Sequence, residues 1–267
     1  ISREAPVLIL RYDSREIRLG GAANASHNVH TLGARVIPIG LVGDDAAGAE
    51  LLGWFRSVGI PTDGILVTGD RPTPVKTRIM AGGSQSTRQQ LVRVDREPVD
   101  PVGPDLEGAL LEQLQSWRSR VDAILLSDYA YGVVTPRLLE AALDRSAPPG
   151  QIVTADSRYD LLRFRGVTAA APNEPEVEGL VGYPLDDEPA VEKAGRQLLE
   201  RLSARLLLVT RGSRGMALLE REGPATFLPI HGSDEIADVT GAGDTVISTF
   251  TLALAAGAPP LEAAWLA

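Results

Sequence analysis

Cysteine is absent from the 267 residues of this chain. Without thiols the protein can form no disulfide, use no thiolate nucleophile and bind no metal through cysteine, and such a composition fits a cytoplasmic protein. Aromatic residues are scarce too, at 4% of the sequence, whereas hydrophobic residues in total reach 44%. We therefore expect a core that is built mainly from aliphatic side chains and alanine.

Basic residues are fewer than acidic ones. The chain has 26 lysines and arginines against 35 aspartates and glutamates, which gives a net charge of −9. No block of basic residues interrupts this acidic balance, so electrostatic binding to nucleic acid or to a membrane surface is not expected. No apolar run reaches the roughly 18 residues that a transmembrane helix needs. The first residues do not resemble a signal peptide.

Short apolar runs alternate with helical patterns along the chain. The runs predicted to be buried strands are Val36–Gly43, Ala123–Ser127, Ile152–Asp156 and Leu206–Thr210. The patterns predicted to be helices are Asp45–Ser57, Leu106–Val121, Pro136–Ser146 and Ala190–Leu202. Strands that are apolar on both faces and alternate with helices predict an α/β fold with a mostly parallel sheet covered by helices.

Two stretches made of three β-type segments break this rhythm: Ala5–Arg11, and the pair Lys76–Met80 and Gln89–Asp95, which no helix separates. Polar residues alternate with valines in the third, and a glycine-containing stretch between the second and third predicts a hairpin. We interpret them as a small antiparallel flap that would close a site from water. The alternative is an edge meander without a function.

The segment Asp238–Thr245, with the sequence DVTGAGDT, carries the clearest chemical signal. Gly241, Ala242 and Gly243 leave the backbone N–H groups accessible at a predicted helix start, where the helix dipole favours an anion such as a transferring phosphoryl group. Asp244 would lie in the first turn, where its carboxylate could accept the proton of an attacking hydroxyl. The alternative is a tight turn followed by an acidic residue that only favours the helix start.

A second glycine-rich segment begins with Gly20 and Gly21, which allow a ligand to approach the backbone closely. Asn24 follows at the start of a predicted helix and offers both a donor and an acceptor to a ligand. Taken alone, Asn24 is better explained as a helix N-cap.

Together the two segments resemble the two signatures of the PfkB (ribokinase-like) family of carbohydrate kinases. The matching positions are Gly20, Gly21, Asn24, Ser26, Gly33 and Gly43 in the first segment, and Asp238, Gly241, Ala242, Gly243, Asp244 and Ser248 in the second. Thr249 departs from the pattern, where a smaller residue is usual. The resemblance implies a three-layer sandwich with a β-flap, or lid, and ATP-dependent phosphorylation of a sugar hydroxyl, with Asp244 as the base.

The same resemblance assigns the nucleotide end of the site. Asn173 and Glu176 occupy an N-x-x-E motif, which in relatives organises Mg²⁺ and phosphate, often through water; Asn173 could instead only cap a helix. The turn TRGSRG supplies Thr210, Arg211, Gly212 and Gly215 as nucleotide-binding candidates, with Arg211 either on phosphate or simply solvated. Dependence on K⁺ is a further property that the family suggests.

Several stretches resemble the kinases of D-glycero-β-D-manno-heptose 7-phosphate within this family, among them Arg88–Glu97 and Leu125–Thr135. The predicted sugar contacts from the flap are Lys76, Arg88, Gln89, Gln90 and Asp95. The segment Asp156–Arg158 and the long flap loop depart from those kinases, so another sugar or nucleoside remains an alternative substrate. A non-catalytic sensor and a dinucleotide-dependent dehydrogenase are the rival classes, and an intact Asp244 and the lack of a G-x-G-x-x-G turn argue against them.

We expect one kinase domain over residues 1–267, with a lid formed by roughly 1–19 and 72–98. By the resemblance, the chain begins after a first strand that carries sugar ligands and stops within a C-terminal helix. Lids of this kind pair between subunits in relatives, so a homodimer through the lid is the expected assembly. His27 and His30 lie three apart on a predicted helix but have no evident third ligand, so no metal site is expected there.

Overall fold

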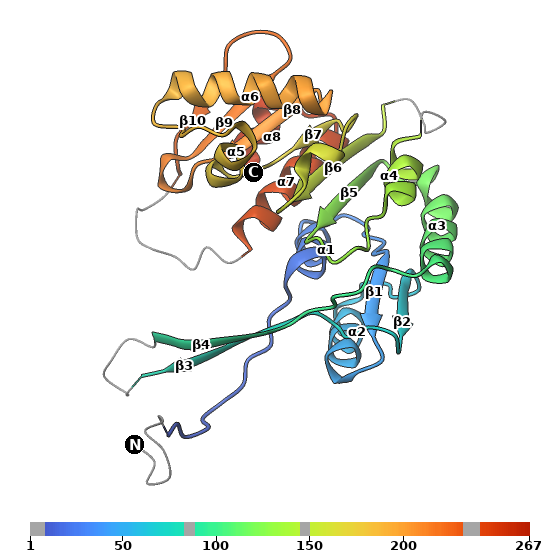
Figure 1. The fold of residues 1–267 in the computed structure, drawn as a ribbon. Helices are drawn as coiled ribbons and strands as arrows, with labels where there is room; N and C mark the ends of the chain where they lie inside the picture. The colour runs from blue at the N-terminus through green and yellow to red at the C-terminus, as the bar shows by residue number, and fades with distance from the viewer. Residues whose placement is uncertain (1–8, 83–88, 145–149, 232–240) are drawn as a thin grey trace.

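The centre of the protein is a six-stranded sheet (Figure 1), seen in a computed structural model that describes residues 9–82, 89–144, 150–231 and 241–267. Its strands are β5 (Ala123–Asp128), β6 (Ile152–Ser157), β7 (Ala169–Ala170), β8 (Leu206–Thr210), β9 (Met216–Glu220) and β10 (Thr226–Leu228). They lie in the order β10-β9-β8-β7-β6-β5. Strands β5 to β8 are parallel, and β9 and β10 join them in antiparallel fashion. The predicted mostly parallel α/β sheet is confirmed.

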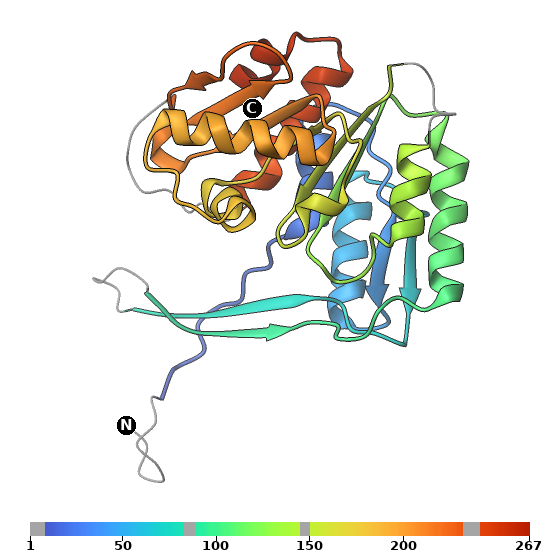
Figure 2. The ribbon, with the colours of Figure 1, turned by 45° about the horizontal axis from the view of Figure 1, so that its top comes forward.

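Strand β8 shows why the sheet is covered on both faces. Leu206 and Leu208 pack with α7 (Ala242–Ala255) and α8 (Pro260–Leu266), whereas Leu207 and Val209 pack with α6 (Glu188–Leu202). All four residues are fully buried. Because side chains alternate across a strand, an uninterrupted apolar run buries residues on two opposite faces, which gives the layers seen in Figure 2.

The other helices of the described chain complete these layers. They are α1 (Gly21–Thr31), α2 (Ala46–Val58), α3 (Pro104–Arg118), α4 (Pro136–Leu143) and α5 (Glu174–Val181), with short 3₁₀ turns η1 (Leu161–Arg163) and η2 (Gly212–Arg214). Helix α1 packs against α7. None of the helices between residues 9 and 267 that the structure describes has both the length and the apolar character needed to cross a membrane.

The predicted strand Val36–Gly43 is shorter than expected and lies outside the central sheet. Only Gly40–Gly43 forms a strand, β1, which pairs in parallel with β2 (Ile65–Thr68) in a separate two-stranded sheet. Pro38 has no N–H to donate to a strand partner, which accounts for the late start. Residues of β1 and β2 pack with α3 and α4 in a third apolar cluster.

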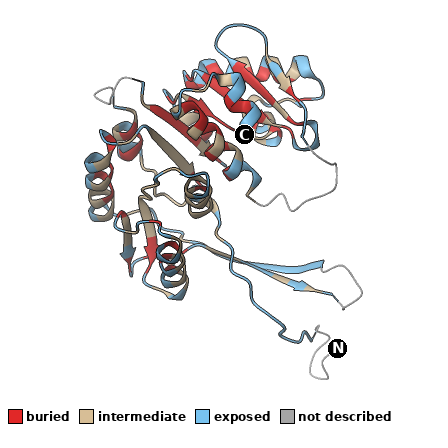
Figure 3. Ribbon diagram, turned by 180° about the vertical axis from the view of Figure 1, so that it is seen from behind, coloured by how far each residue is buried: buried red, intermediate tan, exposed pale blue. Residues whose placement is uncertain are grey.

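The flap is an antiparallel hairpin of β3 (Val75–Ala81) and β4 (Gln89–Arg96), as predicted. It projects away from the body (Figures 1 and 2), and every residue of β4 is exposed, so the hairpin is pale blue along much of its length in Figure 3. The prediction for Ala5–Arg11 is wrong in its described part, because residues 9–11 form no strand. Residues 1–8 and the hairpin loop 83–88, with Arg88, lie outside the described residues.

Candidate active site

Two glycine-rich segments that are far apart in the sequence meet where α1 packs on α7. The Nδ2 of Asn24 donates a hydrogen bond of 2.9 Å to Oδ2 of Asp244. Gly20 is the N-cap residue of α1 and receives no side-chain cap, so the interpretation of Asn24 as an N-cap is wrong. Asp244 is only 3% exposed and lies in the first turn of α7, as expected.

Gly241 is the residue that makes this meeting sterically feasible. It precedes α7 with a φ of +84°, in the left-handed region that favours glycine. A Cβ atom at this position would lie 2.6 Å from Nδ2 of Asn24. The helix begins at Ala242, so its first free N–H groups come from the predicted glycine turn. Residues 232–240, which include Asp238, are outside the described chain.

The sequence analysis missed Tyr129 as a partner of Asp244. Its Oη donates a hydrogen bond of 3.0 Å to Oδ1 of Asp244, so each carboxylate oxygen accepts one side-chain donor. Tyr129 directly follows β5, at the carboxyl end of a parallel strand, where α/β folds place their ligands. Its place directly after a predicted parallel strand is the sequence feature that could have indicated its role.

Asp156, at the end of β6, was also missed. Burial, together with the negative charges of Asp244, Glu176 and Asp128, raises the pKa of Asp156 to about 7. Burial likewise raises the pKa values of Asp244 and Glu176 above their ordinary range, although hydrogen bonds to each carboxylate oppose the shift. Several carboxylates thus share one poorly hydrated region, which favours binding of a cation. Across the described residues, no three acidic, histidine or cysteine side chains are arranged to hold a metal by themselves.

Asn173 and Glu176 form a capping box at the start of α5. The Oδ1 of Asn173 accepts from the Glu176 N–H, and Oε2 of Glu176 accepts from the Asn173 N–H, both at 2.9 Å. The capping role considered for Asn173 is therefore confirmed, and a role in Mg²⁺ or phosphate binding stays a prediction. Asn173 also pairs with Thr210 at the end of β8, which brings the N-x-x-E motif next to the predicted nucleotide turn.

Arg211 is buried in an ion pair rather than solvated. Its Nε donates to Oε1 of Glu174 at 2.9 Å, and its guanidinium lies 5.0 Å from the ring centre of Phe227. Gly212 and Gly215 have positive φ angles, and a Cβ on Gly215 would lie 2.0 Å from the Leu228 carbonyl oxygen. The turn after β8 thus has the expected tight geometry.

A cleft of about 3,500 Å³ joins these parts. The predicted site residues that line it are Gly20, Gly21, Asn24, Lys76, Gln90, Asn173, Glu176, Thr210, Gly241, Gly243 and Asp244. Those that do not are Ala242, Gln89, Asp95, Arg211, Gly212 and Gly215, while Arg88 is outside the described residues. The proposed sugar and phosphoryl regions therefore open into one space, which reaches Thr210 at the start of the nucleotide turn.

The base of the flap carries a network of charged side chains. Lys76 Nζ lies 3.2 Å from Oδ2 of Asp95 and also pairs with Glu97. The register places Lys76 opposite Asp95 and Arg78 opposite Arg93, so these four side chains share one face of the hairpin. Burial acts to lower the pKa of Lys76, but the hydrogen bonds that its ammonium group donates to Glu97 and Asp95 raise it, so Lys76 stays a cation.

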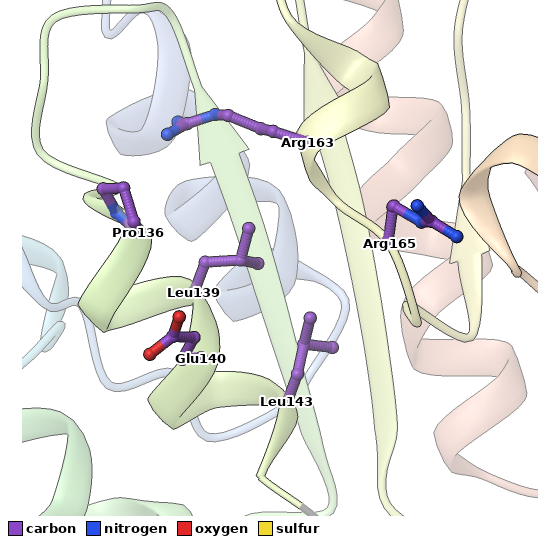
Figure 4. A pocket seen from close by; sticks show the side chains of 6 residues that line it. All are labelled: Pro136, Leu139, Glu140, Leu143, Arg163 and Arg165. Atoms are coloured by element: carbon purple, nitrogen blue, oxygen red, sulfur yellow. The ribbon is translucent and has the colours of Figure 1, made fainter.

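A smaller cavity of about 450 Å³ lies on another part of the molecule, between α4 and the segment that follows η1 (Figure 4). Its apolar wall includes Leu139 and Leu143, and Arg163 and Arg165 lie at its rim pointing away from each other. Arg163 is engaged within the protein, since it donates to Asp128 and to the Val134 carbonyl. This cavity contains none of the predicted site residues.

Comparison with known proteins decides the family. Residues 2–267 match the family model described as pfkB family carbohydrate kinase. The chain belongs to this family. Its geometry agrees, because the two family signatures are the segments that bring Asn24 and Asp244 together. The family that the two sequence signatures predicted is therefore confirmed.

Curated relatives refine the comparison. The chain is 39% identical over 271 residues to the bifunctional protein HldE of Geobacter metallireducens and 38% identical over 268 residues to that of Geobacter sulfurreducens. Each match covers all of this chain and 54% of the relative. The chain thus spans about half the length of these relatives.

Solved structures support the fold. Phosphofructokinase-2 from Escherichia coli in complex with fructose-6-phosphate gives a TM-score of 0.72 at 20% identity and covers 95% of this chain and 84% of its own. The structure of Arabidopsis thaliana ribokinase complexed with ribose and ATP gives a TM-score of 0.69 at 18% identity. That match covers 91% of this chain and 76% of the ribokinase chain. At these identities the likeness establishes the architecture alone.

Proposed function

We propose that this domain transfers the γ-phosphoryl group of ATP to heptose 7-phosphate and forms heptose 1,7-bisphosphate. The observation that carries the proposal is the buried Asp244, fixed in the first turn of α7 beside Gly241 and facing the shared cleft. The similarity to HldE proteins over the whole chain supports the heptose substrate.

In the proposed reaction, the attacking hydroxyl of the sugar forms a bond to the γ-phosphorus while the bond from that phosphorus to the β–γ bridging oxygen breaks. The carboxylate of Asp244 accepts the hydroxyl proton, and ADP leaves with the bridging oxygen. The N–H groups at Gly241–Gly243 stabilise the negative charge on the transferring group, aided by the positive end of α7. The cleft residues Gly20, Gly21 and Asn24 are the proposed sugar platform.

Mg²⁺ fits the carboxylate-rich end of the cleft. Glu176 and Asn173 supply oxygen atoms. Burial raises the pKa of Glu176, although the charge of Arg158 opposes the shift, so a bound cation would favour its ionised form. Mg²⁺ takes few protein ligands and retains water and nucleotide oxygens, so two protein groups suffice. When bound, the ion would neutralise charge on the ATP phosphates. Thr210 and the turn Arg211–Gly215 are the proposed neighbours of the nucleotide. A K⁺ requirement, suggested by the family resemblance, stays a prediction.

A phosphorylated sugar is favoured over a free one by the cations of the flap. Lys76, Arg78 and Arg93 share one hairpin face and line the cleft. Asp95 offsets part of this positive charge, since it pairs with both Lys76 and Arg93. A bound phosphate would further offset the repulsion between Arg78 and Arg93, which lie directly opposite each other. Among the predicted contacts, Gln90 lines the same cleft, and Gln89, Asp95 and Arg88 remain predictions.

Assembly and location are part of the same proposal. We propose that residues 1–267 form one kinase domain whose lid comprises roughly 1–19 and 72–98, and that two copies pair through this lid. Val92 and Val94 support it, because they are 50% and 54% exposed on the face of the hairpin opposite to Lys76. The absence of cysteine from the whole sequence supports a cytoplasmic protein.

The deciding experiment is ADP release by the full-length protein with Mg²⁺-ATP across a panel of sugars and sugar phosphates. Turnover with heptose 7-phosphate alone supports the proposal in full. Turnover with ribose, fructose or a nucleoside instead keeps the kinase and overturns the substrate. Binding of ATP without turnover of any acceptor would favour a sensor that does not catalyse.

A further inference from the structure

Tyr129 lies on a turn that is held by several hydrogen bonds to the side chain of Asp128. The preceding Asp128 is 4% exposed and accepts hydrogen bonds from Ser157 Oγ at 3.2 Å and from Arg163 Nη2 at 2.8 Å. Its Oδ1 also accepts from the N–H of Ala130 at 3.1 Å. Ala130 has a φ of +60°, a conformation that costs a non-glycine residue energy and persists only when its surroundings enforce it.

The ring of Tyr129 passes close to the start of α1. Gly21 begins α1 with a φ of +54°, and a Cβ atom there would lie 3.1 Å from Cε2 of Tyr129. The absence of a side chain at Gly21 therefore lets the phenol pass α1 and reach Asp244. The turn after β5 and the start of α1 thus both have the conformation that the hydrogen bond between Tyr129 and Asp244 requires.

We propose that Tyr129 is a positioning residue for the phosphoryl-transfer reaction, which orients the carboxylate of Asp244 toward the acceptor hydroxyl. This inference rests on the proposed function. Asn24 on Oδ2 and Tyr129 on Oδ1 together prevent rotation of the carboxylate. Each carboxylate oxygen keeps a second lone pair, so the base can still accept a proton.

The electrostatic surroundings suit this role. Burial and the charges of Asp244 and Asp156 raise the pKa of Tyr129, which keeps the phenol a hydrogen-bond donor and prevents it from competing as a base. Asp156 and Arg158 from β6 and the following turn are the other charged groups that face Tyr129, and Glu176 lies beyond them on α5. A hydrogen bond to the charged form of Asp244 favours ionisation, so its loss makes Asp244 harder to deprotonate.

The first test compares the kinetics of Tyr129→Phe with those of the wild-type full-length protein. We expect kcat to fall about tenfold, as for the loss of a hydrogen bond to a charged group, with the KM for ATP within about twofold. The acid limb of the kcat–pH profile should move to higher pH. Tyr131→Phe is the matched control, because Tyr131 lies on the same turn and donates instead to Glu97 at 2.7 Å. Its acid limb should stay in place. An unmoved limb in Tyr129→Phe, or an equal shift in both variants, would overturn the proposal.

The second test needs no turnover. The ¹³C chemical shift of the Asp244 carboxyl is followed against pH by NMR in the wild type, Tyr129→Phe and Tyr131→Phe, with Asp244→Asn to assign the signal. The pKa of Asp244 should be higher in Tyr129→Phe alone, and an unchanged value refutes the role of Tyr129. If no acceptor is turned over but the pKa moves, the proposed function fails while the hydrogen bond retains its effect on the carboxylate.

Discussion

Asn24 and Asp244 are separated by 220 positions in the sequence, yet they share a hydrogen bond of 2.9 Å. The contact joins the first turns of two packed helices, and it is supported nearby by Asn28, whose Nδ2 donates to Oγ1 of Thr245 at 3.1 Å. The interface between α1 and α7 therefore consists partly of the groups proposed to carry out the chemistry.

Asp244→Asn should lower kcat by at least about 10²-fold, since the amide cannot accept the proton of the attacking hydroxyl. Nucleotide binding should persist, because the nucleotide turn lies on other elements. Calorimetric titration of Mg²⁺-ATP alongside the ADP-release assay would check both. Near-normal turnover in this variant would show that another group is the base.

Gly241→Ala should destabilise the fold and the site together. Its φ of +84° costs a residue with a Cβ about 1–2 kcal/mol, and the Cβ would lie 2.6 Å from Nδ2 of Asn24. Gly243→Ala is the matched control for stability, because no atom lies within 4 Å of its added Cβ. Thermal unfolding of both variants should show a loss for Gly241→Ala alone. Equal melting temperatures would contradict the steric argument.

The sequence predicted the structure best in segments whose conformation is determined by the local pattern of apolar and turn residues. The buried strand Leu206–Thr210 was placed correctly, since an apolar run bounded by turn residues suffices to define such a strand. Tyr129 and Asp156 were missed because their importance comes from neighbours on other elements, and a tyrosine or an aspartate at a strand end carries no periodic signal. The interpretation of Arg211 was left open for the same reason, as its partner Glu174 is 37 positions away.

Asp156→Asn should make the stability of the protein less sensitive to a rise in pH from about 4 to about 7. The folded-state pKa of about 7 lies above the usual value of about 4, so between these pH values the folded state binds more protons than the unfolded state. Wild-type stability from this residue therefore falls as the pH rises from about 4 to about 7. The melting temperature of Asp156→Asn should exceed that of the wild type by a margin that grows over this range. Parallel curves for the two proteins would show that Asp156 ionises normally.

Val94→Lys should shift a lid-paired dimer toward monomer. The substitution places a charge on the exposed apolar face of the flap, where a second copy would bury it without a partner. Val99→Lys is the matched control, because Val99 is exposed but lies outside the hairpin strands. Light scattering on the full-length protein gives the mass of each. A wild-type monomer, or equal masses for the two variants, would argue against pairing through the lid.

Arg211→Ala should cost more stability than Arg214→Ala, although both arginines contact Glu174. The side chains of Arg211 and Glu174 are 6% and 9% exposed. Removing one partner of a buried pair costs up to about 3–5 kcal/mol, and here the loss is smaller by what Arg214 still compensates on Glu174. Arg214 is 52% exposed, so its pair is screened by water and contributes at most about 1 kcal/mol. In chemical denaturation, the free energy of unfolding should therefore be clearly lower for Arg211→Ala than for Arg214→Ala. If Arg211 also contacts phosphate, its variant will raise the KM for ATP at temperatures where it remains folded. An unchanged KM would show that Arg211 only stabilises the contact between the nucleotide turn and α5.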